Sequence, residues 1–280
     1  MGKQIKVALI GNPNTGKTSV FNALTGLNQK VGNYPGITVD KKEGVCKLSR
    51  GVKAHILDLP GTYSLNASSI DENVVIELLL NQKDKDFPDV AVVVADVENL
   101  KRNLLLFTQI KDLKIPTLLV INMSDVMARK GITLDIPKLE KLLNTKIALV
   151  STRKGTGLQV LKNLIEAYRT LPKTQCLDAT SIDSNYFERL QKAFPNQEVY
   201  KLWLVIAQDV NFGKLARKEL DISQFLTKSI SELKRLQQQE AIKRYQFING
   251  VLKTCQVIDR LRAKDLRSKL DRILTHKIWG

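Results

Sequence analysis

The stretch Gly11-Asn12-Pro13-Asn14-Thr15-Gly16-Lys17-Thr18 fits the pattern GxxxxGK[ST], follows an apolar run and precedes a helical pattern. This order of strand, glycine-rich loop and helix is typical of a P-loop, in which backbone N–H groups and the positive end of a helix surround phosphate groups. In such a loop the lysine reaches the β- and γ-phosphates, and the following hydroxyl binds Mg²⁺. We expect the phosphate-binding residues to be Gly11, Asn14, Thr15, Gly16, Lys17, Thr18 and Ser19.

Short apolar runs alternate with amphipathic stretches over residues 1–170, which predicts an α/β domain with a doubly wound, mostly parallel sheet. The predicted strands are Lys6–Ile10, Gly44–Leu48, Ala54–Asp58, Val90–Asp96, Thr117–Asn122 and Lys146–Ser151. Five of them lead into a motif at or near their carboxyl ends. In open parallel sheets, ligands bind at the edge formed by the carboxyl ends of the strands.

Strand signals disappear after Pro172, and helical patterns replace them. We expect helices at Tyr186–Phe194, Glu198–Val210 and about Ile222–Leu261, so that a small all-α domain follows the α/β domain. In the first domain, Ser69 and Glu72 have the spacing of a capping box and predict a helix start. The predicted division is 1–170, 171–270 and a terminal segment, 271–280.

Two motifs predict that the base is guanine, which a P-loop alone does not specify. Asn122-Met123-Ser124-Asp125 fits NxxD at the end of a strand, where the aspartate can accept from guanine N1–H and the 2-amino group. Adenine lacks this donor pair and would leave the carboxylate unpaired. Ser151-Thr152-Arg153 is similar to the S-A-[KR] loop whose backbone N–H contacts the guanine carbonyl.

Two further segments predict a nucleotide-dependent switch. Asp58-Leu59-Pro60-Gly61 fits DxxG, in which Asp58 reaches Mg²⁺ through water and Gly61 contacts the γ-phosphate. Thr38 lies in a Gly/Pro-rich loop that can place its hydroxyl on Mg²⁺ when the γ-phosphate is present. Many small GTPases have a glutamine after DxxG that orients the attacking water, but Thr62 stands there. We therefore expect slow hydrolysis, or hydrolysis organised in another way.

The net charge of +16 is concentrated toward the C-terminus, where residues 229–280 hold 12 Lys and Arg against 5 Asp and Glu. Solvated helix faces, a segment beside an anionic membrane and RNA binding each remain open explanations. Three widely spaced cysteines match neither a disulfide framework nor a zinc motif. Because no signal peptide or membrane span is recognisable, we expect this chain to be soluble.

Together the motifs closely resemble the N-terminal region of the FeoB ferrous iron transporters. The resemblance rests on GNPNTGKTSVFNALTG, VGNYPGITV, DLPGTYSL, ADVENLKRNL, NMSD and STRKGTG, and it extends through KRYQFIN to KLDRILTHKIWG. It implies a GTPase domain, a helical domain that favours GDP, and a transmembrane permease absent from this sequence. It also implies a place at the cytoplasmic face of the bacterial inner membrane, beside anionic lipid rather than nucleic acid, and leaves homo-oligomerisation through the helical domain open.

The resemblance also implies that GTP or GDP is bound with Mg²⁺ and K⁺. The family has K⁺ held by an asparagine at the position of Asn14 and by backbone carbonyls around Gly32 and Tyr34. This cation compensates in part for an absent arginine finger. We expect Asn14, Lys17, Thr38 and Gly61 to carry catalysis. Met123 replaces the lysine that stacks on the base in many GTPases, which predicts faster nucleotide release.

Two alternatives follow from the same residues. A soluble GTPase that acts on RNA or ribosomes would use the same motifs with a basic helical appendage. A nucleotide-binding scaffold that scarcely hydrolyses would account for the missing glutamine at Thr62.

Overall fold

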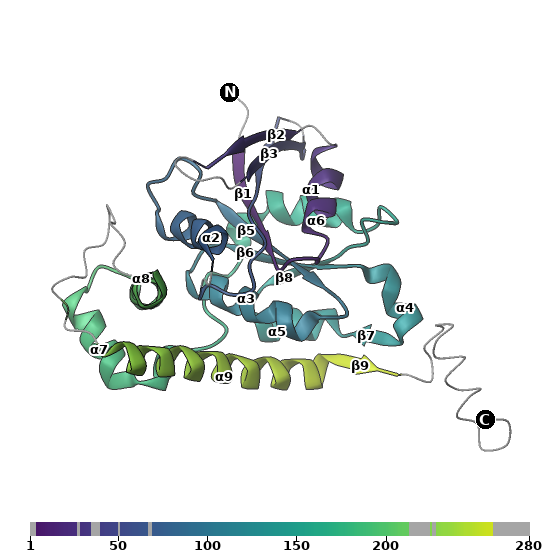
Figure 1. Cartoon of the computed structure of the whole chain (residues 1–280). Coiled ribbons are helices and arrows are strands. Elements are labelled where there is room, and N and C mark those ends of the chain that lie inside the picture. The colour runs from purple at the N-terminus through teal and green to yellow at the C-terminus, as the bar shows by residue number, and fades with distance from the viewer. Residues whose placement is uncertain are drawn as a thin grey trace, which may run out of the picture.

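A seven-stranded sheet with the order β2-β3-β4-β1-β5-β6-β8 forms the centre of the molecule (Figure 1). The computed structural model describes residues 4–26, 29–34, 40–49, 51–66, 69–212, 225 and 228–259. The strands of this sheet are β1 (Gln4–Gly11), β2 (Gln29–Asn33), β3 (Asp40–Lys47), β4 (Lys53–Asp58), β5 (Val90–Asp96), β6 (Thr117–Asn122) and β8 (Lys146–Leu149).

Strands β4, β1, β5, β6 and β8 run parallel, so their carboxyl ends meet at one edge of the sheet. Every residue of β5 and β6 is buried, as expected for central parallel strands that are covered on both faces. Strand β3 runs antiparallel to both β2 and β4. The predicted mostly parallel sheet is therefore confirmed, with a hairpin at one edge that contains the strand β2, which we did not predict.

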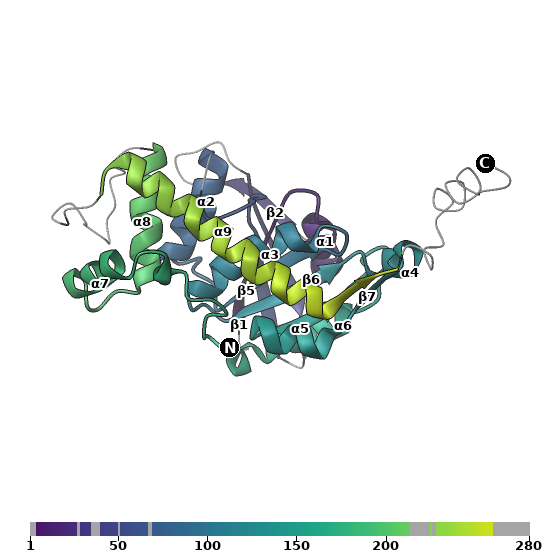
Figure 2. The same cartoon turned by 90° about the horizontal axis from the view of Figure 1, so that it is seen from below.

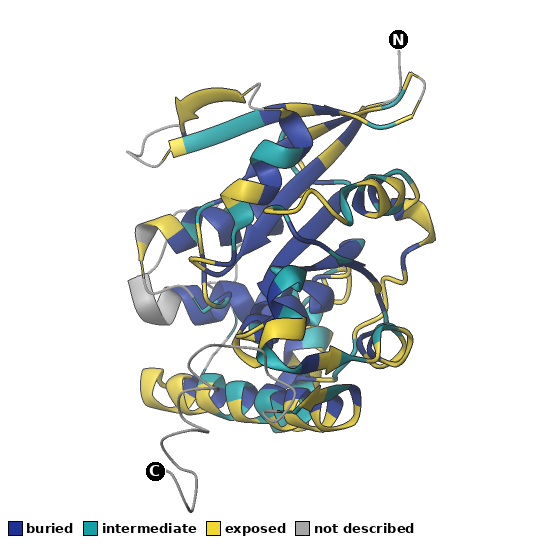
Figure 3. Ribbon diagram, turned by 90° about the vertical axis from the view of Figure 1, so that its right-hand side faces the viewer, coloured by how far each residue is buried: buried dark blue, intermediate teal, exposed yellow. Residues whose placement is uncertain are grey.

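Helices cover both faces of the sheet, and their apolar sides fill two cores (Figure 3). One face packs against α1 (Lys17–Thr25) and α6 (Leu158–Glu166), through side chains such as Phe21 and Leu161. The other packs against α2 (Ile70–Leu80), α3 (Leu100–Asp112) and α5 (Ile136–Leu143). The architecture is the predicted α/β layering.

The C-terminal part consists mainly of the helices α7 (Ser184–Ala193), α8 (Val199–Phe212) and α9 (Ile230–Cys255). Figure 2 shows α9 crossing beneath the sheet, and it contacts α3, α5 and α8. We expected this helix to begin near Ile222, but it begins at Ile230. The Ser229 side chain accepts from the backbone N–H of Glu232, and the Glu232 side chain accepts from the Ser229 backbone, which completes a capping box.

A buried ionic cluster joins α9 to the α/β part. Arg244 is fully buried and donates to Asp112 of α3 at 2.6 Å and to Glu240 at 2.8 Å. Glu240 also accepts from Tyr200 and Trp203 of α8, each at 2.8 Å. Burial raises the pKa of Asp112 to about 6, and Arg244 opposes this shift. Because buried charges are costly unless paired, this cluster favours one seating of α9 on α3.

A second sheet has two strands, one of which lies after Pro172, where we had predicted only helices. Strand β9 (Gln256–Ile258) follows α9 directly and pairs antiparallel with β7 (Ile132–Leu134). β7 lies between α4 (Met127–Lys130) and α5. Runs of three residues are too short to show an alternating pattern, so neither strand was predicted.

In the part of the chain that the structure describes, three short 3₁₀ helices connect the larger elements: η1 (Ser124–Val126), η2 (Tyr168–Thr170) and η3 (Thr180–Ile182). Within the described ranges, none of the helices combines the length and the apolar character needed to cross a bilayer. Residues 271–280, which we expected to form a terminal segment, lie outside the described residues.

Candidate functional site

The P-loop joins β1 to α1 through a turn that requires two left-handed residues. Asn14 has a φ of 66° and Gly16 a φ of 77°, and the Thr15 hydroxyl donates to the carbonyl of Asn12 at 2.9 Å. Successive turns of this kind aim backbone N–H groups into one concavity that suits an anion. Asn14, Thr18 and Ser19 are exposed. The loop therefore has the backbone form and the open side chains of a phosphate-binding loop.

Gly16 is required for a second reason, a close approach to β6. A Cβ atom at Gly16 would lie 2.4 Å from Nδ2 of Asn122, closer than real side chains allow. That Asn122 nitrogen donates to the carbonyl oxygen of Thr15 at 3.1 Å. The end of β6 is thus bound directly to the P-loop.

Lys17 and Asp58 bring opposite charges together at the start of α1. Lys17 Nζ donates to Asp58 Oδ1, and both side chains are largely buried. Burial lowers the pKa of Lys17, and the Asp58 carboxylate opposes that shift. A cation and a carboxylate side by side fit the phosphate and the hydrated Mg²⁺ of a bound nucleotide, respectively.

The DxxG segment is tied to β1 by backbone hydrogen bonds. Leu59 N–H donates to Leu9 at 3.1 Å, and Thr62 N–H donates to Gly11 at 3.1 Å. A Cβ atom at Gly61 would lie 3.1 Å from Cγ of Pro13. Gly61 therefore lies directly against the P-loop, and its contact with a γ-phosphate stays a prediction.

Thr62 points away from the P-loop into a buried polar contact. Its hydroxyl lies 3.0 Å from the Ser64 carbonyl and 3.2 Å from Glu72 Oε1, and its one proton can be donated to either acceptor; the Thr62 side chain is fully buried. Glu72 Oε1 also accepts from Tyr63 N–H at 3.2 Å. Sequence reasoning found Glu72 only as part of the helix start at Ser69, whose hydroxyl does accept from Glu72 N–H. It missed the role of Glu72 in holding this segment.

The NxxD segment follows β6 and is linked to the loop after β8. Asn122 is buried, and its Oδ1 lies 3.4 Å from the backbone nitrogen of Thr152, which donates to it. Met123 adopts a left-handed conformation, with φ 61°, and its methyl carbon lies near Gly16. One side chain, Asn122, therefore joins the P-loop to the third loop of the site.

Asp125 is held as an ionised acceptor. Ser151 is fully buried and donates its hydroxyl to Asp125 Oδ1 at 2.7 Å. Chiefly because of this hydrogen bond, the pKa of Asp125 is lowered, and Arg153, at 3.9 Å from Oδ2, contributes. An oriented, ionised carboxylate at the rim is what a guanine N1–H and 2-amino pair would need.

The switch residues are placed only in part. Gly32 is exposed within β2 and pairs with Lys41 of β3, while Tyr34 is buried. Burial raises the pKa of Tyr34, and Asp86 adds to the effect. Thr38 lies outside the described residues. The Gly32 and Tyr34 assignments therefore stay predictions, as does that of Thr38.

Asn12 is a further residue that the motif did not single out. It is 2% exposed, and neither its Nδ2 nor its Oδ1 has a hydrogen-bond partner in the described part of the chain. A buried amide without partners is costly, and it lies inside the phosphate-binding loop. The GxxxxGK[ST] pattern carries no signal for it, because this position is one of its variable residues.

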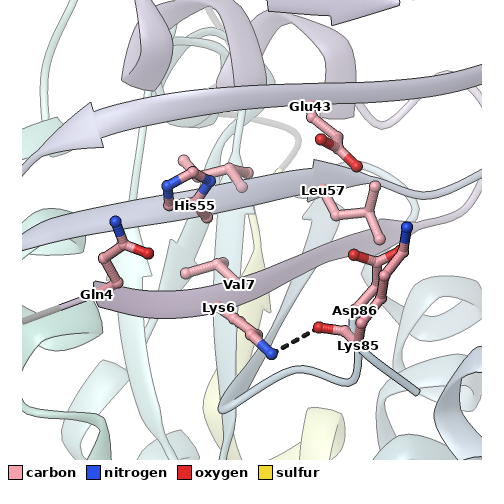
Figure 4. Close-up of a pocket in the computed structure, with 9 residues that line it drawn as sticks. Gln4, Lys6, Val7, Glu43, His55, Leu57, Lys85 and Asp86 are labelled. Carbon is pink, nitrogen blue, oxygen red and sulfur yellow. Dashed lines mark hydrogen bonds between the residues drawn. The ribbon is translucent and has the colours of Figure 1, made fainter. Parts of the chain in front are cut away.

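A separate hollow of about 140 Å³ lies on the sheet away from these loops (Figure 4). Its lining includes Gln4, Lys6 and His55, which belong to the first halves of β1 and β4. Lys6 Nζ donates to the carbonyl of Lys85 there. Because the P-loop, DxxG and NxxD segments follow the carboxyl ends of their strands, this hollow is not the nucleotide site.

Comparison with known proteins identifies the family. The model of the family described as ferrous iron transport protein B matches residues 5–165. The chain is 36% identical to the Fe(2+) transporter FeoB of Leptospira biflexa, over 99% of this chain and 41% of that protein. It is 33% identical to an Fe(2+) transport protein A/Fe(2+) transporter FeoB fusion protein of Porphyromonas gingivalis, of which it covers 35%. The chain thus spans about two fifths or less of these relatives.

Solved structures cover nearly the whole chain. The cytosolic domain of the T. maritima FeoB iron transporter in its apo form is 29% identical, with a TM-score of 0.74 over 91% of this chain and 100% of that one. A mutant of S. thermophilus NFeoB bound to GDP is 32% identical, with a TM-score of 0.72 over 91% of this chain and 100% of that one.

These relatives favour the transporter interpretation over a GTPase that acts on RNA or ribosomes. The matched structures are cytosolic or G-domain parts of FeoB, with the same P-loop fold. From the family match over residues 5–165 and the structural match over both the α/β and the helical part, the chain belongs to the ferrous iron transport protein B (FeoB) family.

Proposed function

We propose that this chain binds GTP and GDP and hydrolyses GTP slowly, with Mg²⁺ and K⁺ as cofactors. The observation that carries the proposal is the position of Asn122, which donates to Thr15 in the P-loop and accepts from Thr152 after β8. Phosphate-binding and base-binding segments are thereby held in one fixed relation. FeoB relatives have been solved with GDP bound, which supports the same ligand class here.

Guanine selectivity is assigned to Asp125 and the loop that begins at Ser151. The Ser151 hydroxyl orients the Asp125 carboxylate, and Arg153 lies near its other oxygen. A base without the N1–H and 2-amino donors would leave this carboxylate desolvated and unpaired. Met123 in place of a stacking lysine would speed release of the base.

Hydrolysis is assigned to the P-loop and DxxG residues. Lys17 would bind the β- and γ-phosphates, Thr18, Thr38 and Asp58 would hold hydrated Mg²⁺, and Gly61 would contact the γ-phosphate. The bound cations would stabilise negative charge as it develops. Thr62 cannot orient the attacking water with its side chain as placed, because its hydroxyl is occupied by Ser64 and Glu72. Asn14, exposed at the P-loop turn, is the proposed K⁺ ligand, together with carbonyls around Gly32 and Tyr34.

The test is GTP turnover by the unmodified chain in KCl and in NaCl, each with Mg²⁺. We expect phosphate release that is faster in KCl, a response to K⁺ that is lost in Asn14→Ala, and no turnover in Lys17→Ala. Equal rates in KCl and NaCl would sink the K⁺ assignment. Absence of turnover with intact GDP binding would support the nucleotide-binding scaffold instead.

We further propose that this GTPase regulates ferrous iron transport by a membrane-embedded remainder of the same polypeptide, at the cytoplasmic face of the bacterial inner membrane. The support is that relatives named as Fe(2+) transporters are more than twice as long as this chain. Residues 171–270 would act as a helical domain that favours GDP, and the basic residues after Ser229 other than the buried Arg244 would lie beside anionic lipid. Iron uptake by the intact polypeptide carrying Lys17→Ala should fall; unchanged uptake would contradict a regulatory role.

A further inference from the structure

The end of α9 is fastened to the segment that follows the NxxD loop. Strand β9 pairs with β7 in the register Ile132–Ile258, Thr133–Val257 and Leu134–Gln256. Backbone hydrogen bonds extend the pairing at both ends: Asp135 N–H donates to Cys255 and Asp259 N–H donates to Gly131, each at 2.8 Å. Figure 1 shows β9 as the last element before the chain leaves the described part.

The other strand of this small sheet, β7, closely follows the proposed guanine-binding segment in the sequence. From Asp125 the chain passes through η1 and α4 to Gly131 and into β7, with no intervening loop. The NxxD loop is itself fixed to β8, because Ser124 N–H donates to the Val150 carbonyl at 3.0 Å. Helix α4 contacts both η1 and β7. A change at Asp125 therefore reaches β9 through one short, continuous set of elements.

The attachment is made by backbone atoms rather than by a packed core. Val257 is 63% exposed and Ile258 is 56% exposed, whereas Ile132 and Cys255 at the edges of the pairing are buried. A three-residue ladder with exposed side chains is stabilised by few contacts, so it can open at low cost while α9 stays in place. Coupling between two sites requires an element with two arrangements. For β9, these would be the strand paired with β7 and the strand detached from it.

We infer that the β7–β9 pairing couples guanine-nucleotide occupancy to the chain segment that follows Asp259. This inference rests on the guanine-binding role proposed above. Bound GDP stabilises the NxxD loop and α4, which stabilises β7 and with it the pairing to β9. By thermodynamic reciprocity, opening the pairing must weaken GDP binding by the same factor that GDP strengthens the pairing.

The register supplies a matched pair of variants that differ by one position. The bonds from Asp135 to Cys255 and from Asp259 to Gly131 mark hydrogen-bonded pairs, and such pairs alternate along an antiparallel ladder. Val257 is therefore in a hydrogen-bonded pair with Thr133, while Ile258 is in a non-hydrogen-bonded pair with Ile132. Proline has no backbone N–H. Val257→Pro therefore removes a hydrogen bond between β9 and β7, whereas Ile258→Pro removes an N–H that makes no hydrogen bond to β7.

The experiment measures release of a fluorescent GDP analogue by stopped flow from the full chain and both variants. We expect Val257→Pro to speed release about fivefold or more and Ile258→Pro to change it less than twofold. Equal effects of the two variants, or an unchanged rate in Val257→Pro, would overturn the inference. Thermal unfolding of each variant shows whether the α/β domain remains folded.

A second measurement avoids substitutions altogether. In the unmodified chain, GDP should slow hydrogen exchange of the Val257 and Asp259 amides, neither of which belongs to a predicted nucleotide-binding segment. If GDP binds and protects Lys17 through Val20 but leaves these amides unchanged, the coupling is refuted while the proposed function stands. If GDP protects neither region, the proposed function itself fails.

Discussion

The side-chain nitrogen of Asn122 lies 3.1 Å from the carbonyl oxygen of Thr15, to which it donates a hydrogen bond. This bond joins the end of β6 to a loop more than a hundred residues earlier in the chain. It also explains why Gly16, the next residue after Thr15, has no room for a side chain. The proposed base-binding and phosphate-binding halves of the site are therefore expected to respond together to substitution.

Gly16→Ala should weaken GDP binding at least tenfold, because its Cβ would displace the Asn122 amide. The left-handed φ of 77° adds strain of about 1 kcal/mol. Gly26→Ala is the matched control, since Gly26 is also left-handed, with φ 64°, but has open space around its Cβ position. We expect this control to lose about 1 kcal/mol of stability and to retain its GDP affinity. Fluorescent GDP titration and urea unfolding give the two quantities; equal affinity losses would contradict the argument.

Ser151→Ala should move the acid limit of GDP binding to higher pH. The pKa of Asp125 is lowered chiefly by the Ser151 hydrogen bond, so binding that needs the carboxylate persists above that pKa and is lost as pH falls through it. Without the hydroxyl, the pKa returns toward its ordinary value and the loss begins at a less acidic pH. GDP affinity measured as a function of pH checks the shift. Ser124→Ala, which removes a hydroxyl from the same segment and keeps Ser151, should retain the unmodified profile.

Thr62→Gln should not accelerate GTP hydrolysis, although it introduces the residue that many small GTPases have after DxxG. The Thr62 side chain is fully buried and faces Glu72 rather than the P-loop. A longer side chain there would overpack the site and destabilise the fold by about 1–3 kcal/mol. Phosphate release and thermal unfolding are the measurements. Thr62→Val removes the hydroxyl at a similar volume, so it separates the effect of the lost hydroxyl from that of overpacking. Faster turnover in Thr62→Gln would contradict the argument, because it would show that the glutamine side chain can reach the nucleotide.

Arg244→Met should destabilise the chain by about 3–5 kcal/mol, because it leaves the buried carboxylates of Asp112 and Glu240 without their cation. Arg235→Met removes an exposed arginine from the same helix and should change stability by less than about 0.5 kcal/mol. Urea unfolding of both variants provides the comparison. If the two variants were equally stable, the ionic cluster would not hold α9 on α3.

The strands that lead into the P-loop, DxxG and NxxD segments were predictable from sequence, because each motif follows a short apolar run. The predicted strands before the P-loop, DxxG and NxxD segments match β1, β4 and β6. β6 is buried throughout, and β1 and β4 are buried in their carboxyl-terminal halves, so local pattern and tertiary environment agree next to the motifs. The start of α9 was predictable in principle, since Ser229 and Glu232 have the capping-box spacing, but the prediction placed it near Ile222.

What the sequence did not reveal depends on contacts between distant segments. The orientation of Thr62 depends on Glu72, ten residues later, and the pairing of Arg244 with Asp112 joins residues that are 132 positions apart. β2, β7 and β9 are short and lack a buried alternating face, so their pairing comes from neighbours rather than from their own residues. The same limit applies to Asn12, whose burial is not visible in a motif that allows any residue there.

Strand β2 forms the outer border of the seven-stranded sheet, and all five of its residues are exposed. It has one neighbour, β3, so detaching it would break one ladder and uncover no apolar core. Among the strands of this sheet it is therefore the least expensive to displace. β2 immediately precedes Tyr34 and the segment that holds Thr38. The edge strand that is easiest to detach therefore lies next in sequence to the residues expected to respond to the γ-phosphate.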